Sequence, residues 1–131
     1  MSLNPKNTVK KPRIEADRKE FPRAHLSTLR IAPRKMKVLA DMIRGKKVED
    51  AVALLSLTPK VGARIMKNLV LSAVYNAENQ DKSGEELYVK TVYVDYGPIM
   101  KWRRPRARGR AFRINKHTRH VTVIVSGKPG K

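Results

Sequence analysis

Residues 97–119 read GPIMKWRRPRARGRAFRINKHTR, and this segment holds nine Lys or Arg residues and no acidic residue. An alternating apolar sequence flanks it on each side, LYVKTVYVDY at residues 87–96 and HVTVIV at residues 120–125. Both flanks are rich in β-branched and aromatic residues and show the period of two that is typical of strands. Together the three segments predict a long antiparallel β-hairpin whose outer half carries the positive charge.

The register of this hairpin follows from pairing its two apolar flanks. When they are paired antiparallel, the numbers of opposing residues sum to about 214–216, so the centre falls near Ala107 and Arg108. Gly109 then lies where a tight turn requires a positive φ. About eleven residues per arm at ~3.3 Å each give an arm on the order of 35 Å. Because such a ribbon is not stable in water by itself, we expect an anionic partner to surround it when it is ordered.

The body of the protein is predicted from helical periodicity upstream of the hairpin. Apolar residues recur at helical spacing in residues 33–44, 48–57 and 58–80, while residues 23–31 are a weaker strand candidate. This order predicts an α+β fold in which three helices pack on a small antiparallel sheet, with a long extended β-hairpin protruding from the domain.

The longest of these helices has a predicted start and a predicted buried stripe. Thr58 is expected as its N-cap and Pro59 as its first helical residue. Apolar residues at helical spacing define the expected stripe, which comprises Val61, Ile65, Met66, Leu69, Val70, Ala73 and Val74.

The charge is distributed unevenly along the chain. The 131 residues include 30 Lys+Arg and 11 Asp+Glu, which gives a formal net charge of +19. Residues 21–48 hold eight basic residues and one acidic residue, and residues 96–131 hold eleven basic residues and none that is acidic. Residues 49–95, with five basic and seven acidic residues, are close to neutral. A near-neutral body between basic segments is typical of a folded domain that presents binding surfaces to a polyanion.

The composition also excludes whole classes of function. Without cysteine the chain has no disulfide framework, no thiolate nucleophile and no Cys-based metal site. His25, His117 and His120 are dispersed and have no acidic cluster beside them, so we expect no metal, no cofactor, no small-molecule substrate and no enzymatic activity. No apolar run is long enough to span a bilayer and no targeting segment is recognised, which predicts a cytoplasmic protein without a membrane partner.

The chemistry of the hairpin is suited to nucleic acid. The arginine guanidinium group matches phosphate in geometry and stacks on bases. Strand alternation predicts four arginines on one face of the ribbon, namely Arg104, Arg106, Arg108 and Arg110. The opposite face is predicted to carry Arg103, Arg113 and Arg119, and Trp102, Pro105 and Phe112 are available to pack on ribose or bases.

Other interpretations of the basic segment remain to be distinguished. It could be a disordered basic linker or a solvated face that aids solubility. An architectural DNA-binding protein also uses basic β-arms and a wedging proline, for which Pro105 would serve. A membrane-active cationic protein fits less well, because it requires an amphipathic helix with a large apolar face.

The spacing of the hairpin residues resembles that of the ribosomal protein twenty-two family of the large subunit. The residues that carry the resemblance are Lys101, Arg106-Ala107-Arg108-Gly109-Arg110 and His120-Val121-Thr122-Val123-Ile124-Val125. Similar stretches are ADMIRGKKVEDA at residues 40–51, SAVYNAENQ at residues 72–80 and VDYGPIMK at residues 94–101. The family usually has Ser where this chain has Ala32. Near the tip the family often has Lys-Arg followed by an apolar residue, whereas in this chain Trp102 directly follows Lys101.

The resemblance implies a structural constituent of the large ribosomal subunit that binds 23S-type rRNA and takes part in subunit assembly. The implied partners are several rRNA domains, neighbouring ribosomal proteins and the nascent peptide. We further expect a single α+β domain over residues 21–131 with 97–119 as its protruding hairpin. Residues 1–20 are expected to form a basic N-terminal extension that has no counterpart in the family pattern and is disordered off the RNA.

The resemblance also assigns residues to each surface. The hairpin tip, which lines the wall of the nascent-peptide exit tunnel in that family, corresponds to Trp102, Arg103, Arg104, Pro105, Arg106, Ala107, Arg108, Gly109 and Arg110. The implied rRNA contacts on the body are Arg34, Lys35, Lys37, Arg44, Lys46 and Lys47. Those on the hairpin are Lys101, Arg103, Arg104, Arg106, Arg108, Arg110, Arg113, Lys116 and Arg119.

Overall fold

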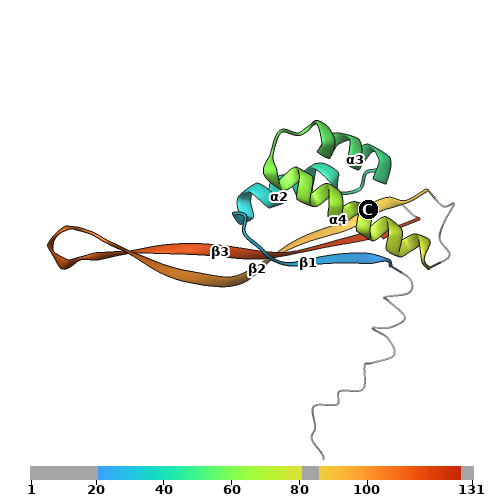
Figure 1. The fold of residues 1–131 in the computed structure, drawn as a ribbon. Helices are drawn as coiled ribbons and strands as arrows, with labels where there is room; N and C mark the ends of the chain where they lie inside the picture. The colour runs from blue at the N-terminus through green and yellow to red at the C-terminus, as the bar shows by residue number, and fades with distance from the viewer. Residues whose placement is uncertain (1–20, 81–85, 128–131) are drawn as a thin grey trace, which may run out of the picture.

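The structure of the chain is a computed structural model that describes residues 21–80 and 86–127 (Figure 1). In chain order its elements are β1 (Arg23–Leu29), α2 (Pro33–Ile43), α3 (Val48–Leu57), α4 (Val61–Glu78), β2 (Tyr88–Pro105), the 3₁₀ turn η1 (Ala107–Gly109) and β3 (Ala111–Ser126). The N-terminal extension predicted over residues 1–20 lies outside the described residues.

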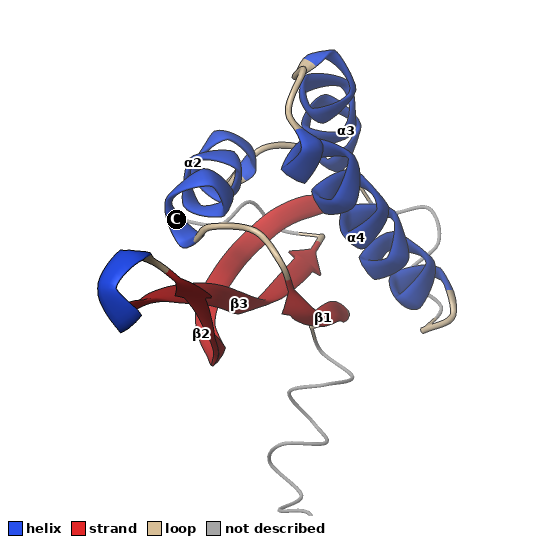
Figure 2. Cartoon of the chain, turned by 60° about the vertical axis from the view of Figure 1, so that its left-hand side comes forward, coloured by secondary structure: helices blue, strands red, loops and turns tan. Residues whose placement is uncertain are grey.

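Three strands form one antiparallel sheet in the order β1-β3-β2. Figure 2 shows α2, α3 and α4 on one side of this sheet, and Figure 1 shows the ends of β2 and β3 running far beyond the helices. The expected α+β fold with a protruding hairpin is therefore confirmed.

The core lies between the helices and one face of the sheet. Helix α2 buries Met36, Leu39, Ala40 and Ile43, the four residues that its periodicity predicts for one face. Opposite the helices, every second residue of β3 is fully buried, at Val121, Val123 and Val125. Gly45, with a φ of 77°, ends the α2 segment and donates its N–H to the carbonyl of Val89 at 2.8 Å, which ties the helix to the sheet.

The start of α4 differs from the prediction. The helix begins at Val61 with Lys60 as N-cap, and the hydroxyl of Thr58 donates instead to the carbonyl of Leu54 at 2.7 Å, at the end of α3. Val61, which was expected in the buried stripe, is the first helical residue and is 80% exposed, because the buried face of α4 begins at Gly62 and Ala63 instead. The buried residues of α4 are Gly62, Ala63, Met66, Leu69, Val70, Ala73 and Ala77.

The register of the hairpin agrees with the prediction. Val89 pairs with Val125 and Pro105 with Ala111, and a bulge between Tyr96 and Ile99 adds one residue to β2. The turn has two residues of positive φ, because Arg108 at 59° joins the expected Gly109 at 68°. Arginine carries the steric cost of this left-handed conformation, which glycine avoids.

The bulge forms the neck where the hairpin leaves the body. The hydroxyl of Thr118 donates to the carbonyl of Pro98. A Cβ at Gly97 would lie 2.6 Å from the hydroxyl oxygen of Thr118 and 3.1 Å from its carbonyl carbon and oxygen. Because β2 and β3 approach this closely only at a glycine, the neck fixes the direction in which the hairpin leaves the sheet.

Candidate nucleic-acid interface

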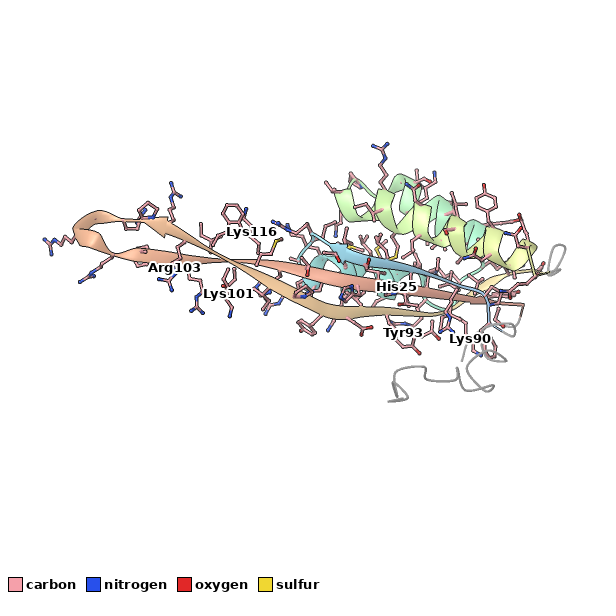
Figure 3. All side chains as sticks on the ribbon, turned by 60° about the horizontal axis from the view of Figure 1, so that its bottom comes forward. His25, Lys90, Tyr93, Lys101, Arg103 and Lys116 are labelled. Carbon is pink, nitrogen blue, oxygen red and sulfur yellow. The ribbon has the colours of Figure 1, made fainter. Side chains whose placement is uncertain are left out.

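The outer hairpin exposes every residue from 98 to 115. Its pairs divide the side chains between two faces of the ribbon. Trp102 lies opposite Ile114 on one face, and Arg103 lies opposite Arg113 on the other. Figure 3 shows Lys101 and Arg103 on one side of the ribbon and Lys116 on the other. One face is therefore mostly cationic, while the other mixes cations with exposed apolar and aromatic side chains.

Cations and rings are adjacent on the mixed face. The ammonium of Lys116 lies 4.1 Å from the centroid of the Trp102 ring, and the guanidinium of Arg106 lies 5.4 Å from that of Phe112. Trp102 is 56% exposed and Phe112 is 54% exposed, so each of the two rings keeps exposed surface that a partner can contact. A ring beside a cation is suited to stacking on a base while the cation contacts the neighbouring phosphate.

The predicted arginine alternation ends at the turn. Arg104 pairs with Phe112 on the mixed face, and the backbone N–H of Arg106 donates to the carbonyl of Arg110 at 2.8 Å across the turn. Arg108 lies inside η1 with its left-handed backbone, so it does not follow the strand alternation. The expectation of four guanidinium groups on one ribbon face therefore fails at Arg108.

Arg119 differs most from its predicted placement. The sequence predicts Arg119 on the ribbon face of Arg103 and Arg113, where it would contact rRNA, but the residue is only 2% exposed. It occupies the same strand face as Val121 and Val123, and its guanidinium lies 4.2 Å from the centroid of the Tyr96 ring. One terminal nitrogen donates to the carbonyl of Thr118 at 3.0 Å, while Nε has no hydrogen-bond partner among the described residues.

Replacing Arg119 with methionine is expected to preserve or raise the free energy of unfolding, by up to about 2 kcal/mol. Arg119 has no carboxylate partner among residues 21–80 and 86–127. A buried charge of this kind carries a desolvation penalty of several kcal/mol, whereas an apolar side chain of similar length carries none. The lost contact with the Tyr96 ring offsets about 2 kcal/mol of that gain. Urea unfolding of the Arg119→Met variant measures the difference, with the exposed Arg23→Met as its control. A loss of more than about 1 kcal/mol would show that stacking on Tyr96 outweighs desolvation.

The basic residues of α2 lie where the sequence placed them. Arg34, Lys35 and Lys37 are all exposed on this helix, and none of them forms an ion pair among the described residues. The ammonium of Lys37 lies 5.8 Å from the centroid of the Tyr96 ring, which is itself 70% exposed. Tyr96 was not predicted as an interface residue, because a tyrosine at the end of a strand carries no local signal that it will be exposed between basic groups.

The basic residues after α2 are less free. Arg44 forms an ion pair with Asp41 at 2.7 Å and donates to the carbonyl of Val92 at 3.3 Å, so it connects α2 to β2. Lys47 forms an exposed ion pair with Glu86 at 3.1 Å, while Lys46 is exposed without an ion pair among the described residues. The neighbouring carboxylates partly neutralise Arg44 and Lys47, which weakens any contact that these two cations make to phosphate.

A small hydrogen-bonded cluster surrounds Lys47. Its hydrogen bond to Glu86 raises the pKa of Lys47, and the hydrogen bonds from Lys47 and from the hydroxyl of Tyr88 lower the pKa of Glu86. The same carboxylate raises the pKa of the Tyr88 hydroxyl. Lys47 and Glu86 therefore remain oppositely charged at neutral pH, and the carboxylate screens this part of the basic surface.

The remaining features are absences within residues 21–80 and 86–127. No helix there is long and apolar enough to cross a membrane. In the same part of the chain no three His, Asp or Glu side chains gather in a group that could hold a metal ion.

Comparison with known proteins gives one consistent result. Residues 24–126 match the family described as ribosomal protein L22p/L17e. The chain is 48% identical to the large ribosomal subunit protein uL22 of Macrococcus caseolyticus (strain JCSC5402) over 105 residues, which are 79% of this chain and 85% of that protein. The matched range runs from β1 to the last residue of β3 and includes the whole hairpin. The resemblance predicted from the hairpin motifs is thereby confirmed.

Proposed function

Because the chain belongs to the ribosomal protein L22p/L17e family, we propose that its hairpin inserts between segments of large-subunit rRNA and that the hairpin tip lines the nascent-peptide exit tunnel. Membership makes the chain a structural constituent of the large ribosomal subunit that binds rRNA, and not an enzyme. Its partners in the subunit are rRNA and other ribosomal proteins. Contact with the nascent peptide and a role in subunit assembly belong to the proposal.

The observation that carries the proposal is the exposure of the hairpin. Residues 98–115 are exposed along both arms and the tip, and the sequence has no acidic residue after Asp95. In water these charges repel one another, and the rings of Trp102 and Phe112 are more than half exposed, at 56% and 54%. An environment of phosphates and bases resolves both problems, because arginine pairs with phosphate and aromatic rings stack on bases. The ribbon is thus better suited to the interior of an RNA than to solvent.

The exposed basic face of α2 supports a second rRNA contact. Arg34, Lys35 and Lys37 lie on the body, at the base of the hairpin rather than at its tip, as the proximity of Lys37 to Tyr96 indicates. Two cationic surfaces separated along the molecule would hold the protein in one orientation on the rRNA, since phosphate contacts fix position and register. Residues 21–131 are proposed to act as one α+β domain in this arrangement.

Site-specific crosslinking tests the position of the tip. A photoreactive benzoylphenylalanine in place of Trp102 is expected to crosslink both to rRNA and to a stalled nascent chain in intact large subunits. The same residue in place of Tyr75, which is 59% exposed on α4, is the control and is expected to give no crosslink to the nascent chain. Crosslinks from position 102 to rRNA alone would leave the rRNA contact intact and refute the tunnel placement.

A further inference from the structure

A cavity of about 500 Å³ opens on the body, and no residue of the outer hairpin lines it. It lies where the loop between β1 and α2 meets the start of α4. Its lining residues are Arg30, Ile31, Ala32, Lys35, Leu39, Lys60, Val61 and Gly62. Of these, only Lys35 belongs to the surfaces predicted from the sequence.

The floor of the cavity is apolar and closely packed. A Cβ at Gly62 would lie 2.9 Å from both Leu39 Cδ1 and the sulfur of Met36, and 3.7 Å from Ile31 Cδ1. The first turn of α4 therefore rests directly on α2, and the side chains beneath it have little room to close the space. Val61 is 80% exposed although it lines the cavity, so it lies at the mouth.

The rim of the cavity is cationic. Arg30, Lys35 and Lys60 come from three separate segments of the chain and converge on one opening. None of the three forms an ion pair in the part of the chain that the structure describes, and no acidic residue lines the cavity. Three unpaired cations around an apolar floor favour a ligand that combines an anionic group with a flat, weakly polar one.

We propose that this cavity receives an unpaired nucleotide of large-subunit rRNA, with its base against Ile31 and Val61, above the buried side chain of Leu39, and its flanking phosphates between the three cations. The volume falls within the range of about 300–1,000 Å³ that is usual for pockets holding small organic groups. Bases turned out of a helix are the parts of RNA that proteins recognise most specifically. The proposal rests on the proposed rRNA function and adds a second, base-reading contact on the body.

Two features favour RNA over a protein partner at this site. An apolar side chain of a neighbouring protein would fit the floor but would leave Arg30, Lys35 and Lys60 without a counter-charge. Lys35 also belongs to the exposed basic face of α2, so a strand of RNA that follows this face passes the mouth of the cavity. A strand of RNA matches both parts of the cavity, because its base can contact the apolar floor while its phosphates contact the cationic rim.

The central experiment fills the mouth of the cavity without changing its charge. Val61→Phe is compared with Leu57→Phe, because Leu57 is similarly exposed at 82% but does not line the cavity. The full chain is bound to large-subunit rRNA, and base reactivity is measured with dimethyl sulfate and a carbodiimide. Val61→Phe is expected to expose one unpaired base that the parent chain protects and to weaken binding about tenfold. Leu57→Phe is expected to change neither quantity.

Charge variants provide a second measurement. Lys60→Gln and Arg30→Gln are each expected to reduce the slope of log affinity against log salt by about 0.7, which is the value for one phosphate contact on a single strand. Arg64→Gln, one turn further along α4 and outside the lining, is the matched control and is expected to leave the slope unchanged. Thermal unfolding of each variant verifies that it is folded.

The outcomes separate this proposal from the proposed function. If Val61→Phe leaves every base reactivity unchanged while the hairpin still protects its own nucleotides, the cavity proposal is wrong and the rRNA function stands. If the parent chain protects no nucleotides through its hairpin, the proposed function itself fails. Unchanged salt slopes for both Lys60→Gln and Arg30→Gln would also refute the cavity as a phosphate site.

Discussion

Replacing residues 102–114 with the two-residue turn Asn-Gly is expected to leave the body folded and to remove most of the affinity for large-subunit rRNA. Lys101 pairs with Asn115, so the new turn closes the ribbon in its existing register. The buried core has no member between Val92 and Val121, and the excised residues are exposed, so their loss removes no core contact.

The effect on binding follows from the charge that is removed. The excised segment contains six arginines, namely Arg103, Arg104, Arg106, Arg108, Arg110 and Arg113. If each contacts one phosphate, the slope of log affinity against log salt falls by about 5, and affinity at ~0.15 M salt falls by a factor on the order of 10⁴.

Thermal unfolding and a salt series of filter-binding measurements give the two results. A melting temperature within about 2 °C of the parent chain is expected, since about 1 kcal/mol shifts the melting temperature of a domain of this size by about 4 °C. Loss of cooperative unfolding would contradict the independence of the body. Retention of nearly full affinity would assign rRNA binding to α2 and the cavity alone.

The second large effect isolates charge from shape. Arg106, Arg108 and Arg110 replaced together by glutamine are expected to lower rRNA affinity about a hundredfold at ~0.15 M salt and to reduce the salt slope by about 2.7. Glutamine keeps the length and hydrogen-bonding capacity of the side chain, so the hairpin retains its shape while the three charges are lost.

The matched control carries the same change of charge on the body. Replacement of Arg23, Arg64 and Lys67 by glutamine is expected to lower affinity by only a few-fold, through the long-range field of the protein, and to leave the salt slope nearly unchanged. An equal loss from both triple variants would mean that net charge alone drives binding and that the hairpin is not a specific contact.

The hairpin could be predicted because two separate segments of the sequence determine how its strands pair. The hairpin register follows from two apolar flanks that must pair, and the structure places Val94 opposite Val121 as that pairing requires. The burial of Arg119 was also encoded, since it has the same parity as Val121, Val123 and Val125. The abundance of basic residues in residues 97–119 concealed this pattern.

Other features depend on contacts that no local pattern reveals. Thr58 and Pro59 form a good helix start in isolation, but the Thr58 hydroxyl bonds to Leu54 and the helix begins at Val61. Arg30 and Lys60 are single basic residues in two loops, and only the packing of α4 on α2 brings them to one cavity. The sequence alone does not predict this cavity, because its lining residues come together only when the helices and loops pack in the folded protein.

The strand order also has a consequence for how the protein is made. β3 is the middle strand of the sheet and follows β1 and β2 in the chain, so neither of them can pair with its neighbouring strand until β3 has been synthesised. Ala24 in β1 pairs with Val123 in β3, so the first and last strands of the chain form contacts between residues that lie far apart in the sequence. Contacts of this kind form slowly because a long loop must close first. During translation the cationic residues 97–119 are therefore synthesised before residues 120–126, which complete the sheet of the body.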